Sequence, residues 1–190
     1  MTEKRTDRRV RRTKALLLES LIKLMSEKDI KDISVKELSD LADINRGTFY
    51  LHYNDVYDML NQIEEELFQE FNGILERDMA AASNVPAFYG PLLDIFIFLD
   101  KHRDLSRVLI GPHGDLSFIN RLKALVKERL RMLMDATEHS MEQFEYFYSF
   151  MVSGCIGVIE CWLNQDTPVP PENIARYCSN LLKGGLPAVQ

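Results

Sequence analysis

The chain has 190 residues, of which 46% are hydrophobic and 27% are charged. This balance is typical of a soluble globular protein, and the length allows one domain or a small domain joined to a larger one. There is no uninterrupted run of about 18 apolar residues, and the basic N-terminus has no apolar stretch like that of a secretory signal. We therefore expect a cytoplasmic protein without a membrane span.

The net charge of −6 is distributed unevenly along the chain. Residues 1–53 contain twelve Lys and Arg against nine Asp and Glu, a net charge of +3, and the remainder carries −9. A basic front on an acidic body favours contact between that front and a polyanion. A solvated basic tail would give the same pattern, so charge alone leaves both interpretations open.

Apolar residues recur at helical spacing along nearly the whole chain, which predicts an all-α fold. The first helix is expected over about Arg8–Glu27. Ser34 and Glu37 then have the spacing of a capping box, in which each side chain bonds the backbone amide of the other residue. This box begins a short helix that ends after Ala42.

A second short helix follows a tight turn at residues 43–44. Asn45 is a good N-cap for this helix, which is expected over Arg46–His52. Phe49 and Leu51 are expected to anchor it to the core. Two short capped helices, joined by a tight turn and preceded by a basic helix, describe a helix-turn-helix.

A longer helix is expected from Val56 to about residue 80, with Asn54 or Asp55 as its N-cap. Residues 82–86 are interpreted as a connection. Further helices are expected over residues 88–99, 105–110, 118–133, 146–165 and 172–183, with a loop at 111–115 and a proline-rich break at 168–171. We assign no role to His113, which lies inside that loop.

The helix over residues 146–165 carries no charge between Tyr146 and Ile159. Its apolar side chains form two roughly opposite seams, one of Phe150, Gly154, Gly157 and Cys161, the other of Tyr148, Val152, Cys155, Ile159 and Trp162. A helix that is apolar on both sides must be covered on both sides. A partner subunit on one seam satisfies this requirement, and so does full burial inside a monomer.

The sequence lacks the residue patterns of the common catalytic and metal sites. There is no Ser-His-Asp arrangement, P-loop, GxGxxG or metal-ligand cluster, so we expect no enzyme, no cofactor and no metal. Cys155, Cys161 and Cys178 are odd in number and irregular in spacing, which favours free buried thiols over a disulfide framework.

Residues 34–38 and 41–53 resemble the DNA-binding signature of the TetR/AcrR family of bacterial transcriptional regulators. The most diagnostic part is the run Gly-Thr-Phe-Tyr-x-His-Tyr at residues 47–53. The resemblance implies a DNA-binding head of three helices over residues 1–54. It also implies a body of about six helices over residues 55–190 that binds a ligand and dimerises, which gives about nine helices in all.

The resemblance also assigns the residues that would contact DNA. Arg46, Thr48 and Tyr50 would face the major groove, which is about 12 Å wide. Tyr50 and His52 would touch phosphates, and Lys36 would lie near the DNA backbone. The basic residues 8–14 would lie close to DNA as well. The full expected set is Lys36, Asn45, Arg46, Thr48, Tyr50, His52 and Tyr53.

Two positions depart from the family's pattern. The family often has Gly in the turn where this chain has Asp43, so we expect a different backbone geometry there. It often has Lys where this chain has Val56, so one usual phosphate contact is missing.

The same resemblance implies a homodimer on a palindromic operator in double-stranded DNA, with half-sites about 34–36 Å apart. The dimer would repress transcription until a small-molecule effector enters the body and shifts the helix that begins at Val56. The expected dimer interface consists of Phe150, Gly154, Gly157, Cys161, Ile174, Cys178 and Leu181. The expected ligand pocket consists of Phe96, Phe98, His102, Arg103, Phe147, Tyr148 and Trp162, although core packing explains the aromatic residues as well.

Two other classes of function stay open on the sequence. The chain could be a ligand-binding protein that has kept the fold without binding DNA. It could also be a protein-interaction module that uses the helix over residues 146–165 to bind a different subunit. Some members of the family respond to a protein partner instead of a small molecule.

Overall fold

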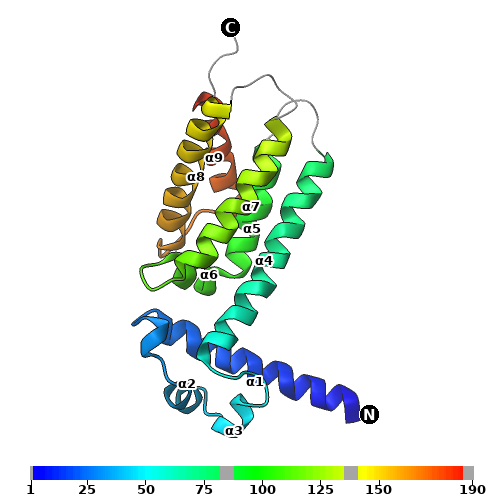
Figure 1. The fold of residues 1–190 in the computed structure, drawn as a ribbon, viewed down its shortest axis with the longest axis vertical. Helices are drawn as coiled ribbons and strands as arrows, with labels where there is room; N and C mark the ends of the chain where they lie inside the picture. The colour runs from blue at the N-terminus through cyan, green and yellow to red at the C-terminus, as the bar shows by residue number, and fades with distance from the viewer. Residues whose placement is uncertain (1, 82–87, 135–140, 186–190) are drawn as a thin grey trace. The chain divides into compact units, whose positions relative to one another are not determined.

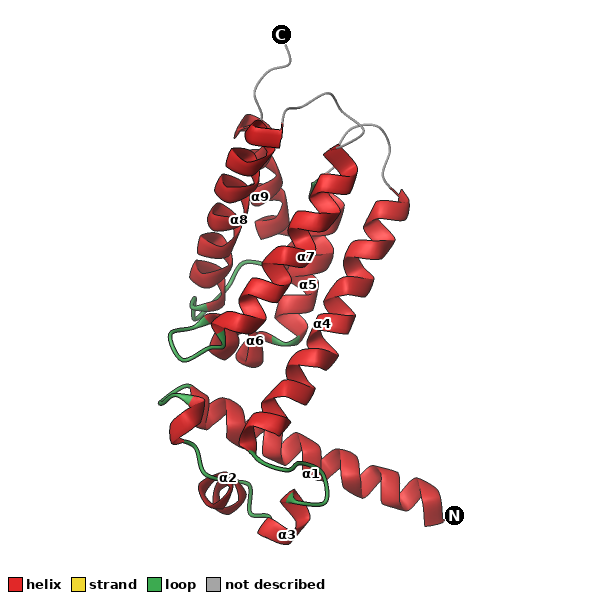
Figure 2. Ribbon diagram, in the orientation of Figure 1, coloured by secondary structure: helices red, strands yellow, loops and turns green. Residues whose placement is uncertain are grey.

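The computed structural model describes residues 2–81, 88–134 and 141–185 (Figure 1). This part of the chain folds into nine α-helices and one short 3-10 helix, and it contains no strand (Figure 2). The prediction of an all-α fold is confirmed. The connection predicted at residues 82–86 lies outside the described residues.

The chain divides into two compact units. One unit, called the head below, contains Met1–Glu66 and Val108–Asp115; the other, called the body, contains Leu67–Arg107 and Leu116–Gln190. The functional boundary that we predict after residue 54 stays a prediction.

The head contains the helices that the sequence predicts at its start: α1 (Thr2–Met25), the 3-10 helix η1 (Ile30–Asp32), α2 (Val35–Leu41), α3 (Arg46–Phe49) and the first turns of α4 (Val56–Ala81). The stripe of Leu17, Leu21 and Leu24 in α1 is buried, as its spacing predicts. However, α1 begins several residues before Arg8. Lys and Arg are good helix formers, so the helix extends beyond its apolar stripe.

Only half of the predicted capping box forms at the start of α2. The Ser34 hydroxyl accepts a hydrogen bond from the Glu37 amide at 3.1 Å, so Ser34 is the N-cap. The Glu37 carboxylate instead accepts from Lys28 Nζ at 2.6 Å, and this ion pair ties α2 to the end of α1.

The turn between α2 and α3 has the backbone geometry that glycine favours. Asp43 has a φ of 53°, in the left-handed region. Its amide donates to the Asp40 carbonyl at 3.3 Å, and the Ile44 amide donates to the Ser39 carbonyl at 2.9 Å. This is the Schellman pattern of a helix C-terminus. Our expectation that Asp43 gives the turn a different geometry is therefore wrong, because Asp tolerates this conformation better than most residues.

The N-cap of α4 is Asp55, one of the two predicted candidates. Its Oδ1 accepts from the Asp58 amide at 2.8 Å, and Asp58 Oδ2 accepts from the Asn54 amide at 2.7 Å. This backbone hydrogen bond, with smaller contributions from Gln62 and the Asn54 side chain, lowers the pKa of Asp58. The two carboxylates therefore fix the first turn of α4.

The body contains the rest of α4, α5 (Tyr89–Lys101), the start of α6 (Arg103–Ile110), α7 (Leu116–Met134), α8 (Met141–Leu163) and α9 (Pro171–Gly185). In the body, α9 packs along α5 and lies beside α8 (Figure 1). Pro171 occupies the first position of α9, where the missing amide hydrogen costs nothing.

One segment of α8, Gln143–Leu163, passes the length and hydropathy criteria for a membrane span. The prediction from uninterrupted apolar runs did not include it, because Ser and Gly residues break the run. Such a single helix is weak support for a membrane span, since core helices of soluble proteins meet the same criteria. Only 22% of its most apolar window is buried in this chain.

Candidate nucleic-acid interface

The short helix α3 is held in place by a cap at its start and a buried side chain at its end. Asn45 Oδ1 accepts from the Gly47 amide at 2.8 Å, as predicted for the N-cap. Phe49 is fully buried, and its ring centroid lies 5.6 Å from that of Tyr53. The cap and the buried ring together orient a helix that has little more than one turn.

The side chains that remain on the outside of α3 are polar. Arg46 is exposed, Thr48 and His52 are half-buried, and Tyr50 is 59% exposed. Hydroxyl, guanidinium and imidazole groups can donate hydrogen bonds to base edges or phosphates. Arg46, Thr48 and Tyr50 therefore lie on one short surface, with His52 just beyond it. These four residues are called the reading set below, and α3 is called the reading helix.

Leu51 does not anchor the helix, which corrects the prediction. It is 79% exposed, one of the most exposed large apolar side chains among the described residues. The inward positions are Phe49 at the end of α3, Tyr53 in the connection that follows and Val56 at the start of α4. Leu51 lies in a turn after α3 has ended, so helical spacing does not decide which way it points.

Tyr53 is a packing residue, although the family resemblance places it among the DNA contacts. Only 5% of its surface is exposed, and Lys14 Nζ lies 5.4 Å above its ring. Burial, followed by the charges of Glu66 and Asp58, raises the pKa of its phenol. Tyr53 therefore offers DNA little surface of its own, whereas Lys36 and Asn45 are exposed.

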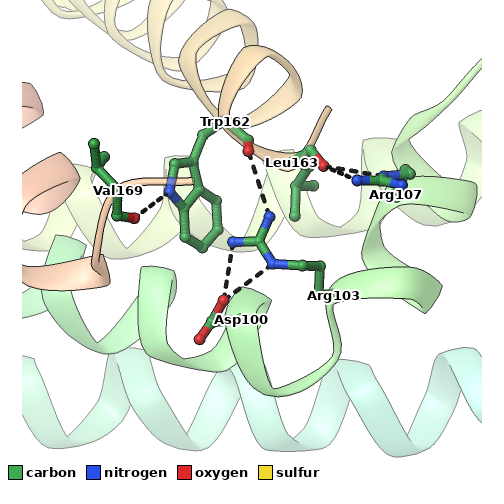
Figure 3. Close-up of polar contacts among 6 residues, drawn as sticks. All are labelled: Asp100, Arg103, Arg107, Trp162, Leu163 and Val169. Atoms are coloured by element: carbon green, nitrogen blue, oxygen red, sulfur yellow. Dashed lines mark hydrogen bonds and ion pairs between the residues drawn. The ribbon is translucent and has the colours of Figure 1, made fainter. Parts of the chain in front are cut away.

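In the body, the side chains of the predicted pocket residues Phe96, Arg103 and Trp162 pack against one another. Trp162 is 1% exposed, with the Phe96 ring edge-on at 5.2 Å and the Arg103 guanidinium 4.1 Å from its ring centroid. The indole Nε1 donates to the Val169 carbonyl at 2.8 Å, and Arg103 binds Asp100 Oδ1 at 2.9 Å (Figure 3). These contacts leave the indole N–H satisfied and its ring covered.

Two arginines of α6 hold the C-terminal end of α8. Arg103 donates to the Trp162 carbonyl at 3.4 Å, and Arg107 donates twice to the Leu163 carbonyl, at 3.0 and 2.6 Å (Figure 3). Cations at a helix C-terminus interact favourably with its unpaired carbonyls. The end of α8 is therefore fixed inside the body.

The other four predicted pocket residues lie in separate clusters. Phe98 packs on His102 at 5.1 Å, and His102 Nε2 lies 3.1 Å from Glu70 Oε2. Phe147 packs on another phenylalanine at 6.5 Å, and the Tyr148 hydroxyl donates to a backbone carbonyl of α7 at 2.7 Å. These are the contacts of packed side chains, and the ligand pocket stays a prediction.

The seam of α8 that contains the glycines faces outward. Phe150 is 68% exposed, and Gly154, Gly157 and Cys161 are also exposed, as is Tyr146 one turn earlier. The opposite seam is half-buried or buried. The structure therefore distinguishes the two seams, which the sequence could not do.

The exposed apolar residues of α9 are not the ones predicted for the dimer interface, with the exception of Leu181. Leu181 and Tyr177 are exposed, whereas Cys178 is only 2% exposed and Ile174 is half-buried. Cys178 lies inside the subunit with Ala175 on the inner face, so it has no surface to offer a partner. The apolar residues that recur at helical spacing in α9 therefore form the face that packs inside the subunit.

The prediction of buried thiols is confirmed for Cys178 but wrong for Cys161, which is exposed, while Cys155 is half-buried. Burial raises the pKa of the Cys155 thiol to about 11, which disfavours the reactive thiolate. Burial also raises the pKa of Cys178. Among the described residues, no group of three or more His, Cys, Asp and Glu could hold a metal ion.

Comparison with known proteins gives consistent matches to transcriptional regulators. A TetR-type family model described as a transcriptional regulator C-terminal region matches residues 88–184, just over half of the chain. The HTH-type transcriptional regulator YxbF of Bacillus subtilis strain 168, itself uncharacterised, is 21% identical over 167 residues. That alignment covers 85% of this chain, and the chain spans 42% of the length of YxbF.

Two solved structures show the same fold over nearly the whole chain. A TetR transcriptional regulator from Streptococcus agalactiae 2603V has a TM-score of 0.60 at 22% identity, covering 93% of this chain and 97% of that one. NalD, the secondary repressor of the MexAB-OprM multidrug efflux pump in Pseudomonas aeruginosa, has a TM-score of 0.70 at 17% identity, covering 94% and 97%. The family match in the C-terminal region is independent of the N-terminal signature, and both lead to one conclusion. The chain belongs to the TetR family of transcriptional regulators.

Proposed function

We propose that the chain binds duplex DNA sequence-specifically and that α3 reads base edges in the major groove. The supporting observation is the polar surface of exposed Arg46, half-buried Thr48 and exposed Tyr50 on a helix that Phe49 anchors from the other side. A capped, anchored helix needs no reordering when it enters the groove. Base contacts from such side chains carry sequence information, whereas phosphate contacts only position the protein.

Phosphate contacts come from the basic surface of the head. Arg8, Arg9, Arg11 and Arg12 are exposed on α1, and Lys36 is exposed at the start of α2. Neutralised phosphates release counterions, so binding is expected to weaken steeply as salt is raised.

We propose that a second copy of this chain covers the outer seam of α8, defined as Tyr146, Phe150, Gly154, Gly157 and Cys161. Glycines in such a seam allow a second helix to approach closely, and exposed Tyr177 and Leu181 continue the apolar surface onto α9. A contact between two identical surfaces gives a two-fold dimer, and a two-fold dimer reads a palindromic operator.

Insertion into a membrane explains the apolar surface of α8 less well than contact with a second copy of the chain does. The candidate span includes Trp162 and Leu163, whose carbonyls are bound by Arg103 and Arg107 and whose side chains are buried. Insertion would have to break these contacts and unpack the indole. A soluble dimer in the cytoplasm leaves them intact, and we place the protein there.

Repression that an effector relieves is the finer part of the proposal. Trp162 is the only tryptophan of the chain, and its ring is covered by Phe96 and Arg103. An effector that enters this part of the body has to separate these side chains. Fluorescence of Trp162 during a titration with small apolar compounds tests this step; a bound compound that releases DNA without changing the emission would place the pocket elsewhere.

Selection from a library of random duplexes tests the DNA-binding proposal. The expected result is one palindromic consensus with half-sites about one helical turn, 34–36 Å, apart. A pool that stays random after repeated rounds would favour the alternative, a ligand-binding or protein-interaction module that has kept the fold. A consensus without a palindrome would contradict the symmetric dimer.

A further inference from the structure

The turn after α6 belongs to the head. Val108–Asp115 groups with Met1–Glu66, although these residues fall within the C-terminal family match. The turn is closed by a hydrogen bond from the Gly114 amide to the Gly111 carbonyl at 3.0 Å. A Cβ on Gly114 would lie 1.8 Å from the Leu109 carbonyl oxygen. Only glycine fits there, so the turn is packed tightly on the end of α6.

His113, in the middle of this turn, binds the connection between α1 and α2. Its Nδ1 lies 2.6 Å from Asp29 Oδ1, and Asp29 Oδ2 lies 3.0 Å from Lys31 Nζ. An ionised carboxylate only accepts, so Nδ1 is the donor. The hydrogen bonds from His113 and then Lys31 lower the pKa of Asp29. The carboxylate therefore remains an acceptor at neutral and mildly acidic pH.

Asp29 occupies a position from which it can fix α2. The Asp29 carbonyl accepts from the Asp32 amide at 3.0 Å to form η1, which leads to the Ser34 cap of α2. The preceding residue, Lys28, binds Glu37 of α2 at 2.6 Å. Because α2 packs on α3, a displacement of Asp29 would be passed on to the reading helix.

We propose that His113 is a positioning residue for DNA binding. Its hydrogen bond to Asp29 holds the connection between α1 and α2, and thereby the helix-turn-helix, in the arrangement that the operator requires. The inference rests on the proposed DNA-binding function and extends it to a residue of the C-terminal region that lies outside the reading set. It also gives a purpose to a turn whose sequence indicated only a loop.

Amide hydrogen exchange of the free, full-length protein tests the positioning contact without DNA. In His113→Ala, amides of residues 28–41 are expected to exchange about threefold to fivefold faster, since the contact is partly exposed. His113→Asn keeps a donor for Asp29, so it is expected to retain most of the wild-type protection.

His102→Ala is the matched control, because His102 makes a similar bond to Glu70 in the body at 3.1 Å. It is expected to leave exchange of residues 28–41 unchanged. Unchanged exchange in His113→Ala, or an equal increase in His102→Ala, would overturn the proposal.

Binding to the selected operator tests the functional consequence. His113→Ala is expected to weaken binding about threefold to fivefold, and to cause no further loss when Asp29→Ala is already present. Additive losses from the two substitutions would overturn the role of His113 and leave the proposed DNA-binding function standing. Failure of the wild-type protein to bind any duplex would overturn the proposed function and, with it, this role.

Discussion

Phe49 and Leu51 lie two residues apart at the end of α3, yet only Phe49 packs in the core. Phe49→Ala is expected to lower the free energy of unfolding by about 3–5 kcal/mol, because it leaves a cavity. Leu51→Ala is expected to change it by less than about 0.5 kcal/mol. Urea denaturation of both variants measures the difference. Equal losses would mean that Leu51 anchors the helix after all.

Tyr50, the C-cap of α3, is 59% exposed. Tyr50→Ala is expected to cost about 1–3 kcal/mol of binding free energy at the selected operator and to leave the melting temperature unchanged. Tyr57→Ala is the matched control, since Tyr57 is similarly exposed and is the second residue of α4, outside the set of residues predicted to contact DNA. Fluorescence anisotropy checks both variants. An equal loss in the two would remove Tyr50 from the reading set.

Hydrogen bonds between residues that are close in the sequence were predictable. The caps Ser34 and Asn45 bond the amides two or three residues ahead, which spacing alone determines. The second partner of Glu37 was not predictable, because Lys28 reaches it through the fold of the chain. The same holds for His113 and Asp29, which are 84 positions apart.

At the scale of elements, the turn between α2 and α3 allows a test of backbone strain. Asp43 has a φ of 53°, where glycine is relaxed and a β-branched residue is strained. Asp43→Gly is expected to keep stability within about 1 kcal/mol of wild type, and Asp43→Val to lose more than about 1 kcal/mol. Thermal unfolding followed by circular dichroism compares them. A valine variant as stable as the glycine variant would contradict the left-handed conformation.

Helices were predicted well because each buries a stripe of apolar residues with a period near 3.6. The ends of the helices were predicted less well where the helix continues beyond its apolar stripe. At its start, α1 extends into polar residues of high helix propensity, and α9 begins at Pro171, which the sequence places in a break. The aromatic residues of the predicted pocket pack against other rings, as aromatic residues commonly do in cores, and the pocket itself stays a prediction.

At the scale of the whole molecule, the outer seam of α8 is expected to hold the dimer together. Phe150→Asp places a charge at its centre and is expected to give monomers in sedimentation velocity at concentrations where the wild-type protein is dimeric. Leu116→Asp is the control, because Leu116 is also highly exposed but begins α7. A Phe150→Asp protein that sediments as the wild type does would show that another surface forms the dimer.

The order of the helices along the chain was predictable in outline, because the N-terminal signature and the helix count both match one family. Which α8 seam faces outward was not predictable, since both seams are apolar and only packing against the rest of the body distinguishes them. The inclusion of residues 108–115 in the head was equally invisible in the sequence. Contacts between distant segments decide both features.

Anisotropy titration of the wild-type protein tests the central claim most directly. The selected operator and a scrambled duplex of equal length are compared at two salt concentrations. We expect the protein to bind the operator at least about 1,000-fold tighter than the scrambled duplex at physiological salt, with a log–log salt slope near −0.9 per phosphate contact. Equal affinity for both duplexes, or no binding to either, would contradict a sequence-specific regulator.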